Sequence, residues 1–241
     1  MDESRTNSPK ERPKDDEEGP VYLPSNEPYL GRESVLAFDQ TIVFVLETNA
    51  KVAALTHRLE LSDLQAAACQ IVPQGINLAL TIRELVRQAY LFGALVLMRP
   101  LVERAAVISY LYANPAEVSK WHDGWHRSLR PNLATMMATM SGQADAKSAA
   151  KTAQDICTHF NHIVHGDPIG SYSNLCQLPD GSLGYSCGRD TRNPSLCDEI
   201  CFQSYCYLMV LGGMALACFP EIKAPMTGPR FGGIAGRDDH N

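Results

Sequence analysis

The stretch FQSYCYLMVLGGMALACF, residues 202–219, decides the fold because it contains no charged side chain. Its length is the minimum for a membrane-spanning helix, while a helix that is apolar on all sides is also typical of the centre of a soluble bundle. Gly212 and Gly213 lie in its middle, Pro220 ends it, and no positive cluster flanks it to set an orientation in a membrane. We therefore interpret it as a buried core helix, with a membrane span as the alternative.

Amphipathic helices are predicted on the N-terminal side of this stretch. Apolar residues recur at steps of three and four over about residues 33–59, which predicts a first helix. Ser62 is suited to cap a second helix, with Gln65 at the third position after it. Pro73 and Gly75 should interrupt that helix, so that a new helix starts near Gln74 and reaches Leu91.

Further helices and one hairpin complete the pattern. After a weak point at Gly93, helices are predicted over about residues 94–113, 129–140 and 144–164, and Pro100 should kink the first of them. Residues 174–186 place Pro-Asp-Gly between two short apolar arms, which predicts a β-hairpin. The sequence thus predicts an all-α fold, a helical bundle of five to six helices with a small β-hairpin insertion and the final apolar helix in its middle.

The two ends of the chain differ in composition from the helical part. Residues 1–30 mix charges of both signs with prolines and residues 221–241 are rich in glycine, so we expect a disordered charged tail, a domain at 31–220 and a flexible C-terminal tail. The formal net charge of −6 argues against a positive field over the whole protein that would attract nucleic acid. The charged N-terminus has no apolar signal region, which predicts a cytoplasmic protein with eight reduced cysteines.

The most suggestive local motif is Asn161-His162-Ile163-Val164-His165-Gly166, at the end of a predicted helix. Asn161 and His165 are four residues apart and therefore share one helix face, and histidine is the side chain best suited to proton transfer near neutral pH. A histidine in the last turn also interacts favourably with the helix dipole, and a following glycine is a common C-cap. The motif predicts either a catalytic site or a structural helix end.

A second motif places Arg99 and Glu103 four residues apart in an otherwise apolar helix. Charges in such a helix must pair, reach water or line a cleft. The arginine-first order is the weaker orientation for stabilising the helix itself. One interpretation is a structural ion pair, and the other is a site in which Glu103 orients the His165 imidazole while Arg99 binds a phosphate or carboxylate.

These residues together resemble a bacterial all-helical family of HEPN-like proteins. The resemblance rests on LMRPLVE at residues 97–103, on Asn114-Pro115 and on Val164-His165-Gly166, and it extends over about residues 62–219. It implies a protein that acts on or binds RNA in a defence or stress context, a metal-independent endoribonuclease with no metal and no cofactor, and a homodimer. We thus expect catalytic roles for His165, Asn161, Glu103 and Arg99.

The chain departs from the family motif at one position. That motif is an arginine, four to six residues, and then a histidine; Asn161 and His165 match its polar residue and its histidine, but Thr158, His159 and Phe160 occupy the positions where the arginine would stand. Either Arg99 or another cation replaces it from elsewhere in the fold, or the nuclease activity is absent. The alternative function is a non-catalytic helical interaction module with a structural polar network.

Cations and aromatic rings alternate in one loop, which contains Trp121, Trp125, Arg127 and Arg130. Such a mixture suits single-stranded RNA, because bases stack on rings while cations contact phosphates. The alternative is that the two tryptophans only attach the loop to the bundle. The loop is therefore a predicted RNA-binding region or a structural anchor.

Four cysteines form a further group: Cys176 and Cys187, which could face each other across the predicted hairpin, and Cys197 and Cys201, which lie one helical turn apart. Their spacing matches no zinc-binding pattern, so we interpret them as small buried thiols, with a zinc site as the alternative. The sequence also contains no phosphate-binding glycine loop, no Gly-x-Ser-x-Gly and no His-Glu-x-x-His. We therefore expect no nucleotide cofactor.

Overall fold

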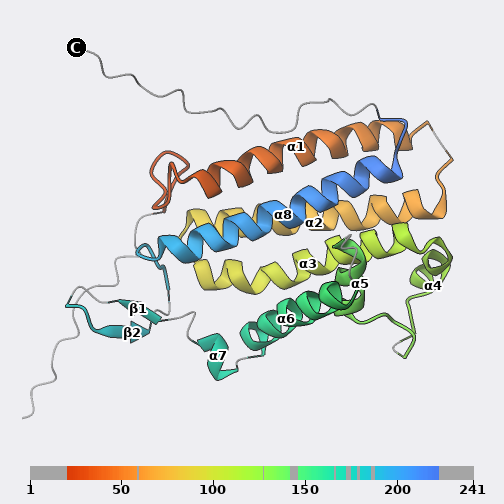
Figure 1. The fold of residues 1–241 in the computed structure, drawn as a ribbon. Coiled ribbons are helices and arrows are strands. Elements are labelled where there is room, and N and C mark those ends of the chain that lie inside the picture. The colour runs from red at the N-terminus through yellow and green to blue at the C-terminus, as the bar shows by residue number, and fades with distance from the viewer. Residues whose placement is uncertain are drawn as a thin grey trace, which may run out of the picture.

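The computed structural model describes residues 21–58, 60–126, 128–141, 146–165, 167–171, 175–177, 180–185 and 188–222. The described chain is an all-α helical bundle, so the predicted fold class is confirmed. Its body consists of long helices that lie side by side in Figure 1, namely α1 (Glu33–Thr56), α2 (Asp63–Arg87), α3 (Leu91–Ala113) and α8 (Pro194–Cys218). The remaining helices are α4 (Val118–His122), which follows a 3-10 turn at Pro115–Glu117, α5 (Leu133–Met140), α6 (Ala146–Val164) and α7 (Pro168–Ser171).

Helix α8 contains the stretch that decided the fold, and it lies between α1 and α3 in Figure 1. It packs against α1, α2 and α3, and Ile200, Leu208 and Leu211 on it are fully buried. By length and composition alone α8 also qualifies as a membrane-spanning helix, with 39% of its apolar window buried inside the bundle. The packing of α8 therefore connects the first helix to α2 and to α3, the helix that carries Arg99 and Glu103.

Helix α2 runs without a break, so the predicted interruption at Pro73 and Gly75 is wrong. An interior proline removes one backbone hydrogen bond and crowds the preceding turn. Here Ile71, Val72 and Ile76 are buried around it, and their burial offsets that cost. The absence of a side chain at Gly75 allows Leu211 of α8 to approach the backbone of α2 closely. Gly75 is therefore a packing contact and not a helix end.

The turn between α2 and α3 lies at residues 88–90, and Gly93 sits inside α3. Ala89 adopts a φ of 60°, a left-handed conformation that is unusual for alanine. Gln88 holds the turn through its side-chain amide, which accepts from the backbone N–H of Tyr22 at 3.2 Å and donates to its carbonyl at 2.8 Å. Tyr22 and Gln88 are far apart in the sequence, so their contact leaves no local signal. The predicted helix break at Gly93 is therefore wrong.

The segment before α1 belongs to the folded domain from residue 21 onward. Glu27 and Tyr29 are buried, and both Arg83 terminal nitrogens donate to Glu27 at 2.6 and 2.7 Å while Arg83 Nε donates to Asp39 at 2.5 Å. The Tyr29 hydroxyl donates to the carbonyl of Asp190. The segment at residues 21–30 thus attaches to α1, α2 and the residues just before α8. Residues 1–20 and 223–241 of the two expected tails lie outside the described residues.

The predicted hairpin is present as β1 (Leu175–Gln177) and β2 (Leu183–Tyr185). The strands are antiparallel, with Leu175 opposite Tyr185 and Gln177 opposite Leu183. Gly181 in the turn has a φ of 82°, a conformation that glycine adopts without strain. Figure 1 shows the hairpin extending away from the helices, at the end of the bundle where α8 begins.

Candidate functional site

Three of the four predicted site residues lie together where α3 meets α6, and we call Arg99, Glu103 and Asn161 the Arg99 cluster. Arg99 Nη1 donates a hydrogen bond to the side-chain oxygen of Asn161. Arg99 Nε lies 3.4 Å from the carboxylate of Glu103, one helical turn along α3. The side chains of Arg99 and Glu103 are 26% and 24% exposed, and Asn161 is exposed. The cluster is therefore half-buried at its base and open to solvent on one side.

Arg99 keeps donors that its two partners do not use. A guanidinium has five N–H donors in a fixed plane, and the described partners engage only Nε and Nη1. The Nη2 group thus remains for an anion, and a planar fork of this kind matches the oxygens of a phosphate. Glu103 fixes the orientation of Arg99 and also reduces the net charge that an incoming anion would meet.

Cys157 lies close enough to the cluster for the charges of Arg99 and Glu103 to act on its thiol, and the sequence reasoning missed it. It is buried on α6 one turn before Asn161, with its sulfur 3.6 Å from the sulfur of Met137. Burial raises the pKa of the Cys157 thiol, and the nearby charges of Arg99 and Glu103 act in opposite directions on it. The signal was the spacing of Cys157, Asn161 and the later histidine at intervals of four, which places all three on one helix face.

His165 follows the last residue of α6 and is exposed. Its backbone N–H donates to the carbonyl of Asn161 at 2.9 Å, so the two residues stack along the helix end. Within the described residues, no hydrogen bond or ion pair joins the His165 ring to Glu103 or Arg99. The structure thus brings Arg99, Glu103 and Asn161 together and leaves the His165 ring one turn away in solvent; Gly166 lies outside the described residues.

The C-terminal end of α6 is held by the residues that follow it. The ring of His162 lies 3.0 Å from the carboxylate of Asp167 through Nδ1. In α7, a side chain at Gly170 would overlap the carbonyl oxygen of His162, so the backbone of α7 packs directly on the last turn of α6. These contacts define where the helix end stands relative to the Arg99 cluster.

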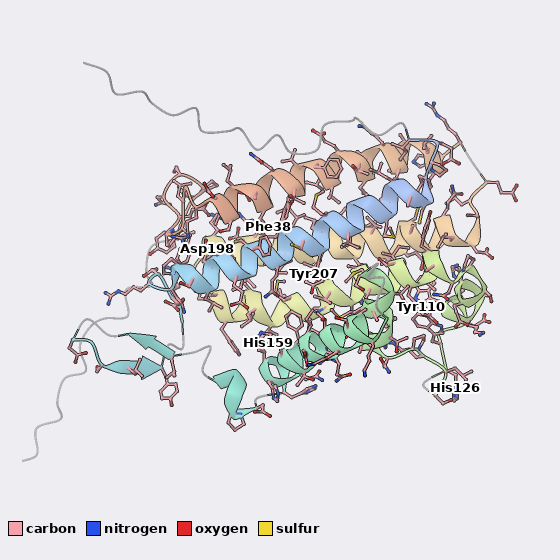
Figure 2. The ribbon with its side chains drawn as sticks, in the orientation of Figure 1. Phe38, Tyr110, His126, His159, Asp198 and Tyr207 are labelled. Carbon is pink, nitrogen blue, oxygen red and sulfur yellow. The ribbon has the colours of Figure 1, made fainter. Side chains whose placement is uncertain are left out.

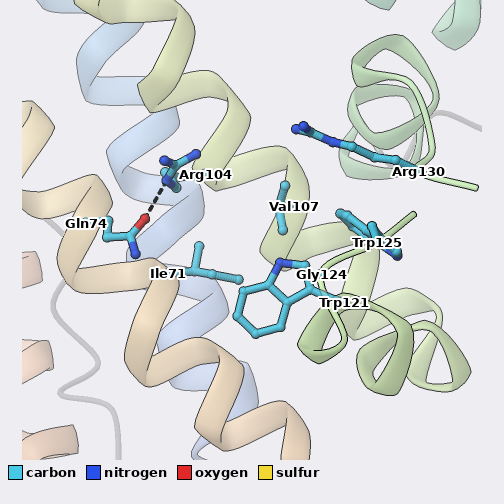
Figure 3. A pocket seen from close by; sticks show the side chains of 8 residues that line it. All are labelled: Ile71, Gln74, Arg104, Val107, Trp121, Gly124, Trp125 and Arg130. Atoms are coloured by element: carbon cyan, nitrogen blue, oxygen red, sulfur yellow. Dashed lines mark hydrogen bonds between the residues drawn. The ribbon is translucent and has the colours of Figure 1, made fainter. Parts of the chain in front are cut away.

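A second candidate site is a cavity of about 310 Å³ between α2, α3, α4 and the loop that follows α4, which we call the tryptophan pocket (Figure 3). Trp121 and Trp125 line it together with Arg130, and Gly124 between them turns the chain with a φ of 81°. Arg127, the fourth residue predicted for this region, lies outside the described residues.

The tryptophan pocket contains two polar residues that the sequence reasoning did not select. Arg104 on α3 and Gln74 on α2 both line the cavity, and Arg104 Nε donates to the side-chain oxygen of Gln74 at 2.7 Å (Figure 3). A charged residue in a helix as apolar as α3 was the available signal. Neither Gln74 nor Arg104 is near the tryptophans in sequence, so only the fold brings them together.

Both tryptophans also pack on the bundle, as the structural interpretation predicted. They are half-buried against the core, and the ring of Trp125 meets Tyr110 edge to face with centroids 6.3 Å apart. Attaching the loop and lining a cavity are compatible roles, because an indole has two faces and an edge.

The cysteines do not assemble into a described metal site. Cys197 and Cys201 are buried one turn apart on α8, and the hydrogen bond between the two thiols, together with burial, raises the pKa of Cys201. The side chain of Cys176 and the whole of Cys187 lie outside the described residues. Among the described residues, no group of three or more potential ligands could hold a metal ion.

A hollow of about 490 Å³ lies between α6 and α8, on the side of α6 where Figure 2 labels His159 near Tyr207. Its lining is mostly apolar and includes Phe160 and the exposed Phe202. Burial raises the pKa of Tyr207 to about 12, with smaller contributions from Cys206 and Cys157. The phenol of Tyr207 is therefore a neutral group at ordinary pH.

Comparison of the chain with protein-family models, curated proteins and solved structures finds no match. The functional argument consequently depends on the two candidate sites themselves.

Proposed function

We propose that the chain is a HEPN-like protein that acts on RNA, as a metal-independent endoribonuclease with the Arg99 cluster and His165 as its site. One observation supports this most directly. The guanidinium of Arg99, from α3, contacts Asn161 of α6, which is the polar residue of the family motif. A cation from a different helix thus stands beside the motif that lacks its own arginine.

The proposed reaction is an internal transfer of the RNA phosphate. His165 takes the proton of the ribose 2′-hydroxyl, the 2′-oxygen attacks the phosphorus, and the bond from phosphorus to the 5′-oxygen breaks. The imidazolium of His165 then gives its proton to the departing 5′-oxygen. The products are a 2′,3′-cyclic phosphate and a 5′-hydroxyl, and His165 returns to its starting protonation state.

The other residues bind and orient in this proposal. The unused Nη2 edge of Arg99 contacts the scissile phosphate and stabilises the charge that develops on its oxygens. Asn161 holds Arg99 and donates from its amide, while Glu103 positions the guanidinium through the 3.4 Å contact. His165 is exposed at the helix end, so its ring is accessible to an RNA backbone that approaches the open side of the cluster.

The test uses the purified full chain with mixed RNA in the presence of EDTA. Cleavage should give products with 2′,3′-cyclic phosphate ends, and His165→Ala should lower the rate by about 10²- to 10⁴-fold, the usual contribution of a proton-transfer group. Arg99→Gln should lower it by about 100-fold, the effect of removing one group that stabilises transition-state charge. His57→Ala and Arg58→Gln, at exposed positions beyond α1, are the matched controls. Intact RNA, or equal cleavage by wild type and His165→Ala, contradicts the proposal.

The second candidate is a non-catalytic helical interaction module. It is favoured by the hydrogen bonds that Arg99 already makes to Glu103 and Asn161, since a polar network of this kind also joins α3 to α6. In that case Asn161→Ala should lower the melting temperature, and no RNA should be cleaved by any variant. The two candidates therefore differ in whether the polar residues affect a rate or only stability.

The proposal also includes a homodimer, which the resemblance implies, and a cytoplasmic location, which the charged N-terminal sequence predicts. Light scattering on the protein as it elutes from a size-exclusion column measures its mass directly. A mass close to that of one 26.5 kDa chain would contradict the dimer.

A further inference from the structure

We propose that the tryptophan pocket binds one nucleotide unit, with the base against the indoles and the phosphate on Arg104 and Arg130. The pocket lies between α2, α3, α4 and the loop that follows α4. The site proposed for cleavage lies where α3 meets α6. Binding in the pocket is thus independent of whether the chain cleaves RNA.

Charge is the first reason. Arg104 and Arg130 come from different elements and converge on the same cavity. In the part of the chain that the structure describes, neither has a carboxylate within ion-pairing distance. The protein as a whole has a net charge of −6, so two unpaired guanidiniums at one cavity form a local attraction for an anion such as phosphate.

The aromatic lining is the second reason. Trp121 and Trp125 both line the cavity, and the edge-to-face contact with Tyr110 fixes the Trp125 ring before any ligand enters. An indole stacks on a nucleobase of any sequence, and each such stack contributes substantially to binding. Ordered rings lose little conformational entropy on binding, which favours affinity.

Size and hydrogen bonding limit the ligand to a small planar one. A cavity of about 310 Å³ lies at the lower end of the range of about 300–1,000 Å³ for small-molecule sites. Gln74 adds an amide at the wall, with its oxygen already accepting from Arg104 Nε at 2.7 Å and its NH₂ group able to donate to a base edge. Phosphate, base and one donor together describe a nucleotide, which comes either from a free mononucleotide or from single-stranded RNA.

The chain provides its own reporter for the test. It contains only two tryptophans, and both line the pocket, so all tryptophan fluorescence reports on this site. Titration with AMP or with a short single-stranded oligoriboadenylate should quench that fluorescence to saturation. Adenosine, which lacks the phosphate, and ribose 5-phosphate, which lacks the base, should each bind at least about tenfold more weakly, because a hydrogen-bonded charge or a stacked base is lost.

Variants separate the pocket from the rest of the surface. Arg104→Gln and Arg130→Gln should each weaken binding by about tenfold, while Arg58→Gln, at an exposed position outside the pocket, should not change it. Trp121→Phe and Trp125→Phe each leave one reporter, so the quenching of the remaining tryptophan can still be measured. Circular dichroism of every variant identifies those that fail to fold, and Arg130→Gln is a loop change that leaves all helices untouched.

The outcomes distinguish the ligand source and the two proposals. Tight binding of AMP supports a free nucleotide, and binding of the oligonucleotide alone supports a nucleotide within RNA. Three results would each overturn the proposed nucleotide site. They are the absence of quenching by AMP and by the oligonucleotide, binding of ribose 5-phosphate as tight as that of AMP, and an affinity that both arginine variants leave unchanged. His165→Ala should bind with the affinity of wild type, so loss of cleavage and loss of pocket binding are separate results.

Discussion

Replacing Gly75 with alanine should separate two opposing effects on the free energy of unfolding. In a helix interior, alanine is favoured over glycine by about 1 kcal/mol. At this position the added methyl group would overlap Leu211 Cδ1 and would stand 3.3 Å from Cδ2 and 3.4 Å from Cγ. Because Leu211 is fully buried in α8, it can move only by disturbing the packing between α2 and α8.

The magnitude follows from comparison with a second glycine. Overpacking a buried contact costs about 1–3 kcal/mol. Gly213 in α8 is also inside a long helix, and a methyl group there meets no atom within 4 Å. Both substitutions gain the same helix propensity, so Gly75→Ala should be less stable than Gly213→Ala by about 1–3 kcal/mol, the packing cost alone.

Denaturant unfolding followed by circular dichroism gives this difference directly. The pair Gly75→Ala and Leu211→Ala completes a double-mutant cycle, in which Leu211→Ala alone should cost about 2–5 kcal/mol. The double variant should lose less than the sum, because the new methyl group occupies part of the space that Leu211 vacates. Equal stability of Gly75→Ala and Gly213→Ala, together with additivity in the cycle, would refute the close packing of α2 against α8.

Three further predictions concern the ion pair between Glu27 and Arg83, the thiol of Cys218 and the N-terminal cap of α2. Glu27→Gln should destabilise the fold by about 1–3 kcal/mol in denaturant titrations, because it weakens a buried partner of Arg83; exposed Glu60→Gln is the control. Burial raises the pKa of Cys218 to about 11, so the thiol of the unfolded chain loses its proton at a lower pH than the thiol of the folded chain. The free energy of unfolding should therefore fall as the pH rises from about 9 to 11, and Cys218→Ala should reduce that fall. Ser62→Ala should cost about 1 kcal/mol in thermal unfolding, because it removes the capping box of α2; an unchanged midpoint argues against that cap.

Local chemistry made several elements predictable from the sequence. The cap at Ser62 and Gln65 opens α2 as expected, and Asn114-Pro115 ends α3 because proline restricts the residue before it. The Pro-Asp-Gly sequence predicted the hairpin that β1 and β2 form. Each of these signals acts over a few residues, so neighbouring side chains are sufficient to read it.

The polar pairs of the candidate site were predictable only in part. The spacing of Arg99 and Glu103, and of Asn161 and His165, is a property of single helices and is visible in the sequence. That Arg99 contacts Asn161 depends on how α3 packs on α6. The sequence left open whether Glu103 pairs with Arg99 or orients His165, and in the described residues it pairs with Arg99.

The sequence by itself therefore determined an all-α bundle around one apolar helix, since helical periodicity and local caps are short-range effects. Tertiary structure alone decided that α2 continues through Pro73, that the chain turns at Ala89, and that Arg104 joins the tryptophans at one cavity. The physical reason is common to all three. Each depends on burial or hydrogen bonds between residues that are far apart in the sequence, and no window of the sequence contains both partners of such a contact.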